Sequence, residues 1–170
     1  MFGSLGCLRP EAVRPLASEL AGRLARHRIE MVCGPLVEGA FVALMAASEL
    51  GVEFAYAERR ADSRSEALYP VAYRIPGALR LRVRGKRLAL VNDVVNAGSA
   101  VRGTFADLAA CGAEIVALGA LVTLGSWAAN FARDQHLPLE SLAALPNRLW
   151  TPRECPLCGA GVPLAEGAAR

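Results

Sequence analysis

The sequence predicts an α/β fold, in which a mostly parallel sheet is flanked by helices. Short apolar runs alternate with amphipathic segments along the chain, which is the order that parallel strands with helical crossovers require. The 170 residues, 54% of them hydrophobic, are enough for one sizeable core. The 16 glycines and 10 prolines are close to ordinary usage, which excludes collagen-like and wholly disordered classes.

The chain is predicted to begin with a helix, a strand and a second helix. Apolar residues recur at helical spacing within residues 10–28, so this segment predicts an amphipathic helix. Residues 29–33 form a short apolar run that is typical of a strand. A Gly-Pro pair separates this run from the helical stretch at 40–50, which Gly51 is placed to end.

A charged segment then interrupts the alternation. Residues 52–57 alternate toward a strand, whereas the charged residues 58–66 lack periodicity and predict a mobile loop. Residues 69–73 and 79–83 predict two further strands. In the rest of the chain we expect a buried strand at 87–91, a helix that ends at Gly112, a strand at 114–122, a short helix at 127–135 and a final strand at 137–142.

Charge and hydropathy exclude several classes of function. The net charge of +3 is too small to predict nucleic-acid binding. The uncharged run at 115–132 approaches the length of a membrane span, but Gly119, Gly125 and Asn130 divide it into shorter elements, so we expect no membrane segment. No apolar stretch follows basic residues at the start of the chain, so we expect a cytoplasmic protein.

The cysteines and histidines give weak signals. The chain has five cysteines, Cys7, Cys33, Cys111, Cys155 and Cys158, and this odd, dispersed number favours reduced thiols. We expect three of the five to be core residues. The Cys155/Cys158 pair is similar to half of a zinc ribbon, so a metal there would need ligands from a partner subunit. His27 and His136 lie near predicted helix or loop ends, where surface or capping roles are expected.

The segment after the strand at 87–91 carries the most chemical information. Asp93 follows the apolar run, and the small residues 97–100 then open a helix. Backbone N–H groups at such a turn can hold a phosphate, and an acid can bind sugar hydroxyls, so the pair predicts a phosphoribosyl site. The alternative from spacing alone is an ordinary loop in which Ser99 caps the helix.

Residues 88–100, read as LALVNDVVNAGSA, resemble the phosphoribosyl pyrophosphate (PRPP) signature of type I phosphoribosyltransferases, and most nearly that of orotate phosphoribosyltransferases. Residues 34–39 are similar to the pyrophosphate loop of that family, and residues 54–60 to the strand before its catalytic loop. The resemblance implies a phosphoribosyltransferase domain at 1–150 and a CPLC-containing tail at 151–170, and it implies that the N-terminal hood over the base is missing.

The resemblance also implies an activity, the Mg²⁺-dependent transfer of ribose 5-phosphate from PRPP to orotate, which gives orotidine 5-phosphate. It assigns catalytic roles to Asp93 and Asn92, facing the ribose hydroxyls, with Asp93 an indirect contact for Mg²⁺. It assigns the base to Asn96 and Leu124. It implies a homodimer and the following PRPP-binding residues: Val94, Val95, Asn96, Ala97, Gly98, Ser99, Ala100, Leu36, Val37, Glu38, Gly39, Arg59 and Arg60.

Three positions depart from the family pattern. Asn92 stands where the signature has an acid, and Leu124 stands where orotate enzymes place an arginine against the orotate carboxylate, a contact that Arg74 or Arg133 would have to replace. Glu38 in the pyrophosphate loop either binds Mg²⁺ or faces solvent. These departures keep two alternatives open: a non-catalytic PRPP-binding regulatory homologue, and a phosphoribosyltransferase for another base.

Overall fold

The structure is a computed structural model that describes residues 9–61, 71–148, 150 and 153–163. Its centre is a sheet with the strand order β3-β2-β1-β4-β5-β6, in which every neighbouring pair is parallel except the edge pair β2 and β3. The strands are β1 (Met31–Pro35), β2 (Glu53–Ala61), β3 (Val71–Arg74), β4 (Arg87–Val95), β5 (Glu114–Leu124) and β6 (Leu139–Leu145).

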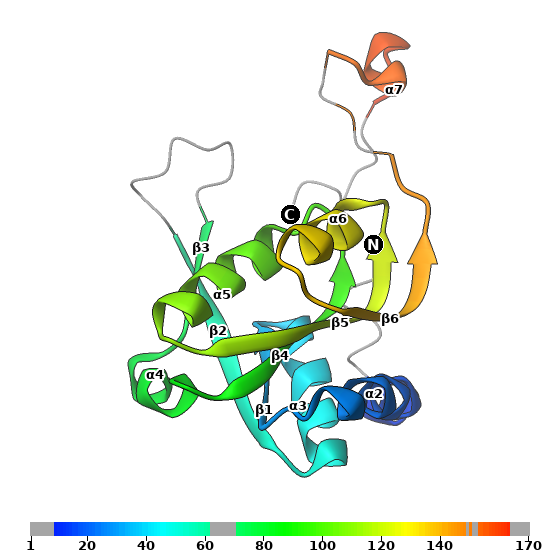
Figure 1. The fold of residues 1–170 in the computed structure, drawn as a ribbon. Coiled ribbons are helices and arrows are strands. Elements are labelled where there is room, and N and C mark those ends of the chain that lie inside the picture. The colour runs from blue at the N-terminus through cyan, green and yellow to red at the C-terminus, as the bar shows by residue number, and fades with distance from the viewer. Residues whose placement is uncertain (1–8, 62–70, 149, 151–152, 164–170) are drawn as a thin grey trace.

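Helices cover both faces of this sheet (Figure 1). The helices of the structure are α2 (Pro10–Leu24), the 3-10 helix η1 (Ala25–His27), α3 (Glu38–Leu50), α4 (Gly77–Val83), α5 (Ser99–Ala110), α6 (Trp127–Asp134) and α7 (Pro156–Gly159), and α7 lies apart from the sheet. Helices α2 and α3 pack on one face, and α4, α5 and α6 pack on the other. The predicted fold class, a mostly parallel sheet flanked by helices, is therefore confirmed.

Strand β4 lies in the middle of the sheet and contributes to a core on each side. Leu88 and Leu90 pack in the cluster below α5 and α6, whereas Ala89 and Val91 pack in the cluster below α2 and α3. All four side chains are buried. A strand covered on both faces needs an unbroken apolar run rather than alternation, which explains why 87–91 was recognisable as a buried strand.

The predicted strand at 79–83 is wrong, because these residues belong to helix α4. Leu79 and Val83 lie four residues apart, one helical turn, and both pack on the core, while Leu81 is 79% exposed. Pro76 and Gly77 start the helix, and the Leu79 amide donates to the Pro76 carbonyl. Alternating apolar and basic residues were consistent with a strand, and tertiary packing selected the helix.

Two strands extend into segments that were predicted to be loops. Strand β2 continues to Ala61 by pairing with β3, so the expected loop at 58–66 begins as strand, and residues 62–66 lie outside the described residues. Strand β4 continues to Val95 by pairing with β5. The other predicted elements agree with the structure except for a few residues at their ends.

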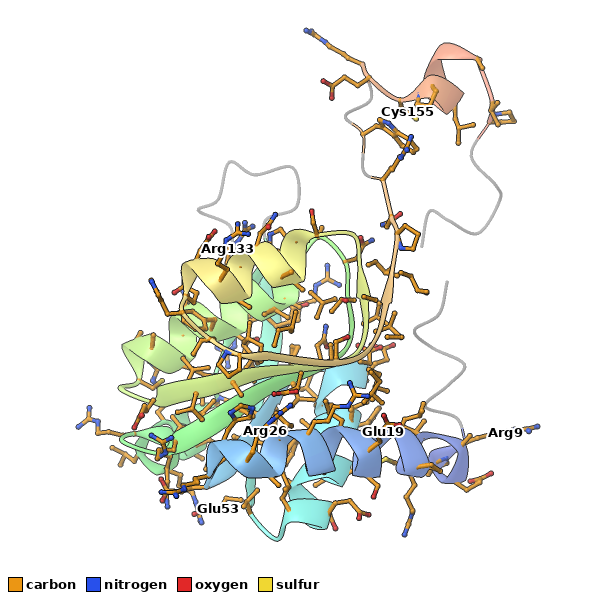
Figure 2. All side chains as sticks on the ribbon, turned by 45° about the vertical axis from the view of Figure 1, so that its right-hand side comes forward. Arg9, Glu19, Arg26, Glu53, Arg133 and Cys155 are labelled. Carbon is orange, nitrogen blue, oxygen red and sulfur yellow. The ribbon has the colours of Figure 1, made fainter. Side chains whose placement is uncertain are left out.

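The C-terminal tail extends away from the sheet and carries the short helix α7 (Figures 1 and 2). Cys155 and Cys158 are at this helix, whereas Cys33 and Cys111 are buried in the core and Cys7 lies outside the described residues. Burial raises the pKa of the Cys33 thiol well above its usual value.

Within the described part of the chain, no three His, Cys, Asp or Glu residues are grouped to hold a metal ion. The helices described there are also too short or too polar to cross a bilayer.

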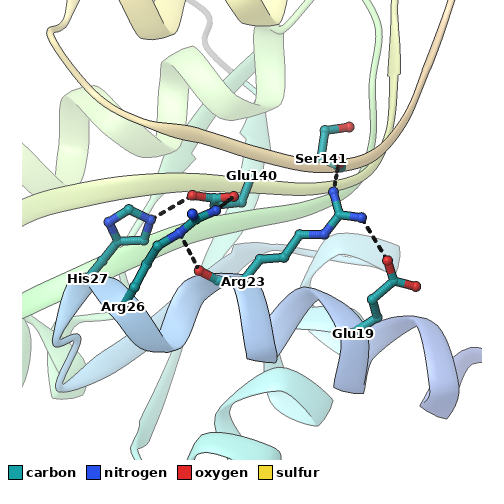
Figure 3. A network of polar contacts seen from close by, with 6 residues as sticks. All are labelled: Glu19, Arg23, Arg26, His27, Glu140 and Ser141. Carbon is teal, nitrogen blue, oxygen red and sulfur yellow. Dashed lines mark hydrogen bonds and ion pairs between the residues drawn. The ribbon is translucent and has the colours of Figure 1, made fainter.

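A polar network fixes the edge strand β6 to helix α2 and η1 (Figure 3). The carboxylate of Glu140, 9% exposed, contacts His27 Nε2 and Arg26 Nη2, each at 2.7 Å. Arg23 Nη1 donates to the Ser141 carbonyl at 2.5 Å. His27 therefore has a buried partner across the fold and is more than the surface or capping residue that its position in the sequence indicated.

We expect this network to make stability depend on pH. Burial raises the pKa of Glu140, but hydrogen bonds from His27 and Arg26 outweigh it, so the pKa lies below its usual value. A lowered carboxyl pKa stabilises the fold above the pKa of the unfolded chain, and this stabilisation is lost as pH falls through the lower folded value. Glu140→Gln should cost about 1–3 kcal/mol at neutral pH and flatten the loss of stability on acidification.

Denaturant unfolding of both proteins between about pH 7 and pH 3 measures this difference. Glu114→Gln is the matched control, because Glu114 is also a carboxylate of the sheet with an arginine partner, Arg87, but its side chain is 57% exposed. That control should change the free energy of unfolding by less than about 1 kcal/mol. If the free energy of unfolding of Glu140→Gln fell with decreasing pH as steeply as that of the wild type, the network would not be the source of the pH dependence.

Candidate functional site

The predicted site residues gather at the carboxyl ends of β1 and β4. These strands are parallel neighbours, so the segments that follow them emerge at the same edge of the sheet. Gly39, at the start of α3, lies against the side chain of Asn92: a Cβ on this glycine would be 2.1 Å from Asn92 Oδ1. The structure thus brings together the two segments that resemble a pyrophosphate loop and a PRPP signature.

The end of β4 and the segment that follows it form a cavity of about 250 Å³ at the start of α5. It is lined by Asn92, Val94, Val95, Asn96, Ala97, Gly98, Ser99, Ala100 and Val101. The first helical hydrogen bond runs from the Arg102 amide to the Gly98 carbonyl, so the amides of residues 99–101 have no carbonyl of their own helix to bind. Such a helix start attracts anions. Every PRPP-binding residue predicted between Val94 and Ala100 lines this cavity.

The alternative expectation that Ser99 caps this helix is wrong, because α5 begins at Ser99 itself. Gly98 is the N-cap residue, and α5 has no side-chain cap hydrogen bond. Gly98 has φ +75°, a left-handed conformation that favours glycine, and the ring of Trp127 lies directly against it. A Cβ at Gly98 would be 2.0 Å from that ring, which stacks in turn on Phe131 at 4.8 Å. The segment is therefore held in shape by helix α6.

The segment after β1 is held by its neighbours in a similar way. The Leu36 amide donates to the Ala57 carbonyl of β2 at 2.8 Å, and the peptide bond from Leu36 to Val37 is cis. Helix α3 starts at Glu38 without a side-chain cap, so its first-turn amides have no helical partner. Gly34 and Gly39 approach closely, because a Cβ on Gly34 would lie 2.5 Å from the Gly39 carbonyl oxygen. Two helix starts therefore face one edge of the sheet.

Asp93 and Asn92, the predicted catalytic pair, differ in their surroundings. Asp93 is half-buried and is not among the residues that line the cavity. Burial, and more weakly the charge of Glu38, raise the pKa of Asp93, although the Val94 amide acts against them. Asn92 is buried and donates from Nδ2 to the Val94 carbonyl at 2.9 Å. The single acid on this strand segment is therefore Asp93, held in an environment that disfavours its charge.

Glu38 and Arg59 carry two further charges, and both affect the pKa of Tyr73. Burial raises the pKa of Tyr73, the charge of Arg59 lowers it and the charge of Glu38 raises it. The charge of Glu38 also raises the pKa of Asp93, and Glu38 is half-buried at the start of α3. Arg60 is exposed on β2 and pairs with Glu58 at 3.0 Å.

A second cavity of about 290 Å³ adjoins the first and shares Asn96 with it. It is lined by Asn96, Leu124, Gly125, Ser126, Trp127, Asn130 and Asn147. Both residues predicted to bind the base, Asn96 and Leu124, are among these. Asn147 Nδ2 donates to Asn96 Oδ1 at 2.8 Å.

Five residues of the second cavity were missed by sequence reasoning: Gly125, Ser126, Trp127, Asn130 and Asn147. Trp127 and Asn130 lie three residues apart on α6, one helical turn, and this spacing was the only available signal. Asn147 follows β6, and its approach to Asn96 depends on the pairing of β6 with β5.

Comparisons with known proteins agree with this geometry. The chain matches no protein-family model. It is 28% identical over 157 residues to an orotate phosphoribosyltransferase of Caldanaerobacter subterraneus, covering 89% of this chain and 73% of the relative. It is also 28% identical over 166 residues to the Thermotoga maritima protein of the same name, covering 95% and 79%.

Solved structures with the same fold include more than one kind of phosphoribosyltransferase. The adenine phosphoribosyltransferase of Thermoanaerobacter pseudethanolicus matches with a TM-score of 0.65 at 17% identity, over 82% of this chain and 83% of that one. The orotate phosphoribosyltransferase of Aeropyrum pernix matches with a TM-score of 0.60 at 23% identity, over 79% and 72%. The chain therefore has the fold of the type I phosphoribosyltransferases and resembles the orotate phosphoribosyltransferases in sequence.

Proposed function

We propose that this protein transfers ribose 5-phosphate from PRPP to a nitrogenous base. One observation carries the proposal: the cavity at the start of α5 and the cavity beside α6 meet at Asn96. A sugar phosphate in the first cavity would place its anomeric carbon toward the second. The base nitrogen then attacks that carbon, the bond to pyrophosphate breaks, and pyrophosphate leaves with the bonding electron pair.

Asp93 has the electrostatic role in this reaction. Loss of pyrophosphate develops positive charge on the ribose, and a nearby carboxylate stabilises that charge more in the transition state than in the ground state. Burial raises the pKa of Asp93, so its negative charge is poorly solvated before the reaction and gains most when a cation forms beside it. The helix starts of α5 and α3 are suited to the 5-phosphate and the pyrophosphate.

The donor set fits a Mg²⁺ ion held mainly by the substrate. Mg²⁺ commonly binds one or two protein carboxylates, several waters and substrate phosphates, and Asp93 with Glu38 could supply that number. These two residues would hold the ion, directly or through water. When bound, Mg²⁺ neutralises charge on the pyrophosphate as it leaves. Binding of the other phosphates would fall to Arg59 and to backbone amides.

Sequence similarity makes orotate the first acceptor to test, with orotidine 5-phosphate as the product, because the two relatives above are named for it. A non-catalytic PRPP-binding role is the second candidate. This non-catalytic role is favoured by Asn92, because its side-chain Nδ2 already donates to the Val94 carbonyl and its amide carries no charge for catalysis. The homodimer and the cytoplasmic location remain predictions.

Calorimetry with PRPP, with and without Mg²⁺, tests the proposal, followed by pyrophosphate release in the presence of orotate, uracil and purine bases. Micromolar PRPP affinity with release that depends on a base supports the enzyme. Affinity without release from any base supports the non-catalytic alternative. If neither PRPP nor ribose 5-phosphate binds, both the enzymatic function and the non-catalytic PRPP-binding role are rejected.

A further inference from the structure

We propose that the cavity beside α6 selects an uncharged base with an amide-like edge, an N–H next to a carbonyl, over a base that carries a carboxylate. This inference rests on the proposed function, because it assigns the acceptor of the same reaction. It differs from what the names of the sequence relatives suggest. Its basis is the set of side chains around the cavity and the charges near it.

Among the described residues that line this cavity, none is cationic: three are asparagines, and the others are Leu124, Gly125, Ser126 and Trp127. A carboxylate taken out of water needs a cation or several donors to offset its lost solvation. Leu124 offers neither, because its side chain cannot donate a hydrogen bond or hold a charge. A carboxylated base would therefore find amide and hydroxyl donors here but no cation to pair with its charge.

The two arginines that could replace the missing contact are engaged elsewhere. Arg74 Nη1 contacts Asp107 Oδ1 at 3.1 Å, and this buried carboxylate also takes a contact from Arg80 at 2.9 Å. Arg133 lies near the other end of α6 from Trp127, pairs weakly with Asp134 at 3.7 Å and is 73% exposed. The expectation that Arg74 or Arg133 lies opposite Leu124 is not met, since neither lines the cavity.

The segment that leads to Asn96 carries an acid. Asp93 precedes Asn96 by three residues in the chain. With no metal ion bound, a carboxylate brought into the adjoining cavity would be repelled by Asp93 rather than attracted. An uncharged base avoids this repulsion.

The asparagines provide what an uncharged base requires. Because Asn147 Nδ2 donates to Asn96 Oδ1, the two side chains hold each other in place. In that arrangement the amide nitrogen of Asn96 remains a donor and the amide oxygen of Asn147 remains an acceptor. An N–H next to a carbonyl is complementary to such a pair. Asn130 adds a third amide from α6, and Leu124 and Trp127 add apolar surface for the ring.

Calorimetry with two nucleotides that differ by a single carboxylate tests the inference on the full chain. Uridine 5-monophosphate and orotidine 5-phosphate share their ribose phosphate, so the ratio of their dissociation constants reports on the base cavity alone. We expect uridine 5-monophosphate to bind about tenfold more tightly. Tighter binding of guanosine or inosine 5-monophosphate than of orotidine 5-phosphate would also support the inference, because these purine bases carry an N–H next to a carbonyl.

Two results overturn the inference while leaving the proposed function intact. One is tighter binding of orotidine 5-phosphate than of uridine 5-monophosphate. The other is binding of ribose 5-phosphate without added affinity from any base. Absence of ribose 5-phosphate binding would instead reject the proposed function, so the two failures are distinguishable.

Leu124→Arg tests the mechanism of selection. It should raise the affinity for orotidine 5-phosphate about tenfold and leave that for uridine 5-monophosphate within about twofold. The matched control is Leu81→Arg, the same change at a side chain that is 79% exposed on α4, a helix that contributes no residue to the lining of this cavity, and it should alter neither affinity. If Leu124→Arg fails to fold, Asn130→Ala is the second variant.

Asn130 is exposed on α6, so its replacement by alanine should leave the fold intact. The variant should weaken uridine 5-monophosphate about fivefold, the loss of one hydrogen bond, and leave ribose 5-phosphate unchanged. An equal loss for both ligands would mean that Asn130 acts on the sugar phosphate, and an unchanged affinity for both would mean that it does not meet the base. Either result contradicts the inference.

Discussion

Gly98→Ala is expected to lower the affinity of the protein for ribose 5-phosphate about 100-fold, which is about 2.7 kcal/mol. A methyl group at this position would lie 2.0 Å from the ring of Trp127. Since Trp127 is stacked on Phe131, the ring cannot move away without disturbing α6, so the backbone of residues 97–100 shifts instead. The amides at the start of α5 then no longer converge on the phosphate.

The control for this prediction is Gly85→Ala. Gly85 has φ +68°, nearly the same left-handed conformation as Gly98, but no atom lies within 4 Å of the position its Cβ would take. Gly85→Ala should therefore cost only the conformational penalty, about 1 kcal/mol of stability, and leave ribose 5-phosphate binding unchanged. The comparison separates backbone strain from the clash with the tryptophan.

A double variant extends the test. Trp127→Ala combined with Gly98→Ala removes the obstructing ring, so part of the lost phosphate affinity should return relative to Gly98→Ala alone. Calorimetry with ribose 5-phosphate and denaturant unfolding measure the two effects. If Gly98→Ala binds ribose 5-phosphate as the wild type does, this segment is not the phosphate site.

Asp93→Asn should lower turnover about 100- to 1000-fold while making the folded protein more stable at neutral pH. The loss of turnover follows from removing the carboxylate that we propose stabilises the ribose cation. The gain in stability follows from the raised pKa of Asp93, which reflects burial first and Glu38 second. A carboxyl whose pKa is higher in the folded than in the unfolded chain stabilises the fold in its protonated form, and this stabilisation is lost as pH rises through the folded value.

The stability difference between Asp93→Asn and wild type should therefore grow from acid to neutral pH, the opposite direction to the effect expected for Glu140→Gln. Asp134→Asn provides the control, because Asp134 is 64% exposed at the end of α6 and has only a long contact to Arg133. Pyrophosphate release and unfolding as a function of pH give both readouts. Retention of turnover in Asp93→Asn would show that another group stabilises the ribose cation.

The core and most of the element order could be predicted from local pattern. The apolar run at residues 88–91, the helical spacing in α2 and the glycine that ends α3 each reflect a short-range rule that packing did not overrule. Helix α4 shows where such rules fail, because alternating apolar residues over one short segment satisfy a strand and a helix equally. Only the burial of Leu79 and Val83 on the same face decided between them.

The cavity at the start of α5 was likewise predictable, since its residues all lie between Asn92 and Val101 and the order of an acid, small residues and a helix is a local signal. The cavity beside α6 was predictable only in part, through Asn96 and Leu124. Asn96, Leu124, Trp127 and Asn147 are far apart in sequence, and their meeting depends on the pairing of β4 with β5 and of β5 with β6.

The sequence by itself determined the alternation of strand and helix, the buried centre of the sheet and the glycine-containing turn that suits a sugar phosphate, because each is encoded within a few neighbouring residues. Tertiary structure alone decided that Trp127 fixes Gly98, that Asn147 orients Asn96 and that Arg74 and Arg133 are kept from Leu124. The physical reason is that side-chain contacts between strands and helices distant in the chain are set by register and packing, which no local pattern records.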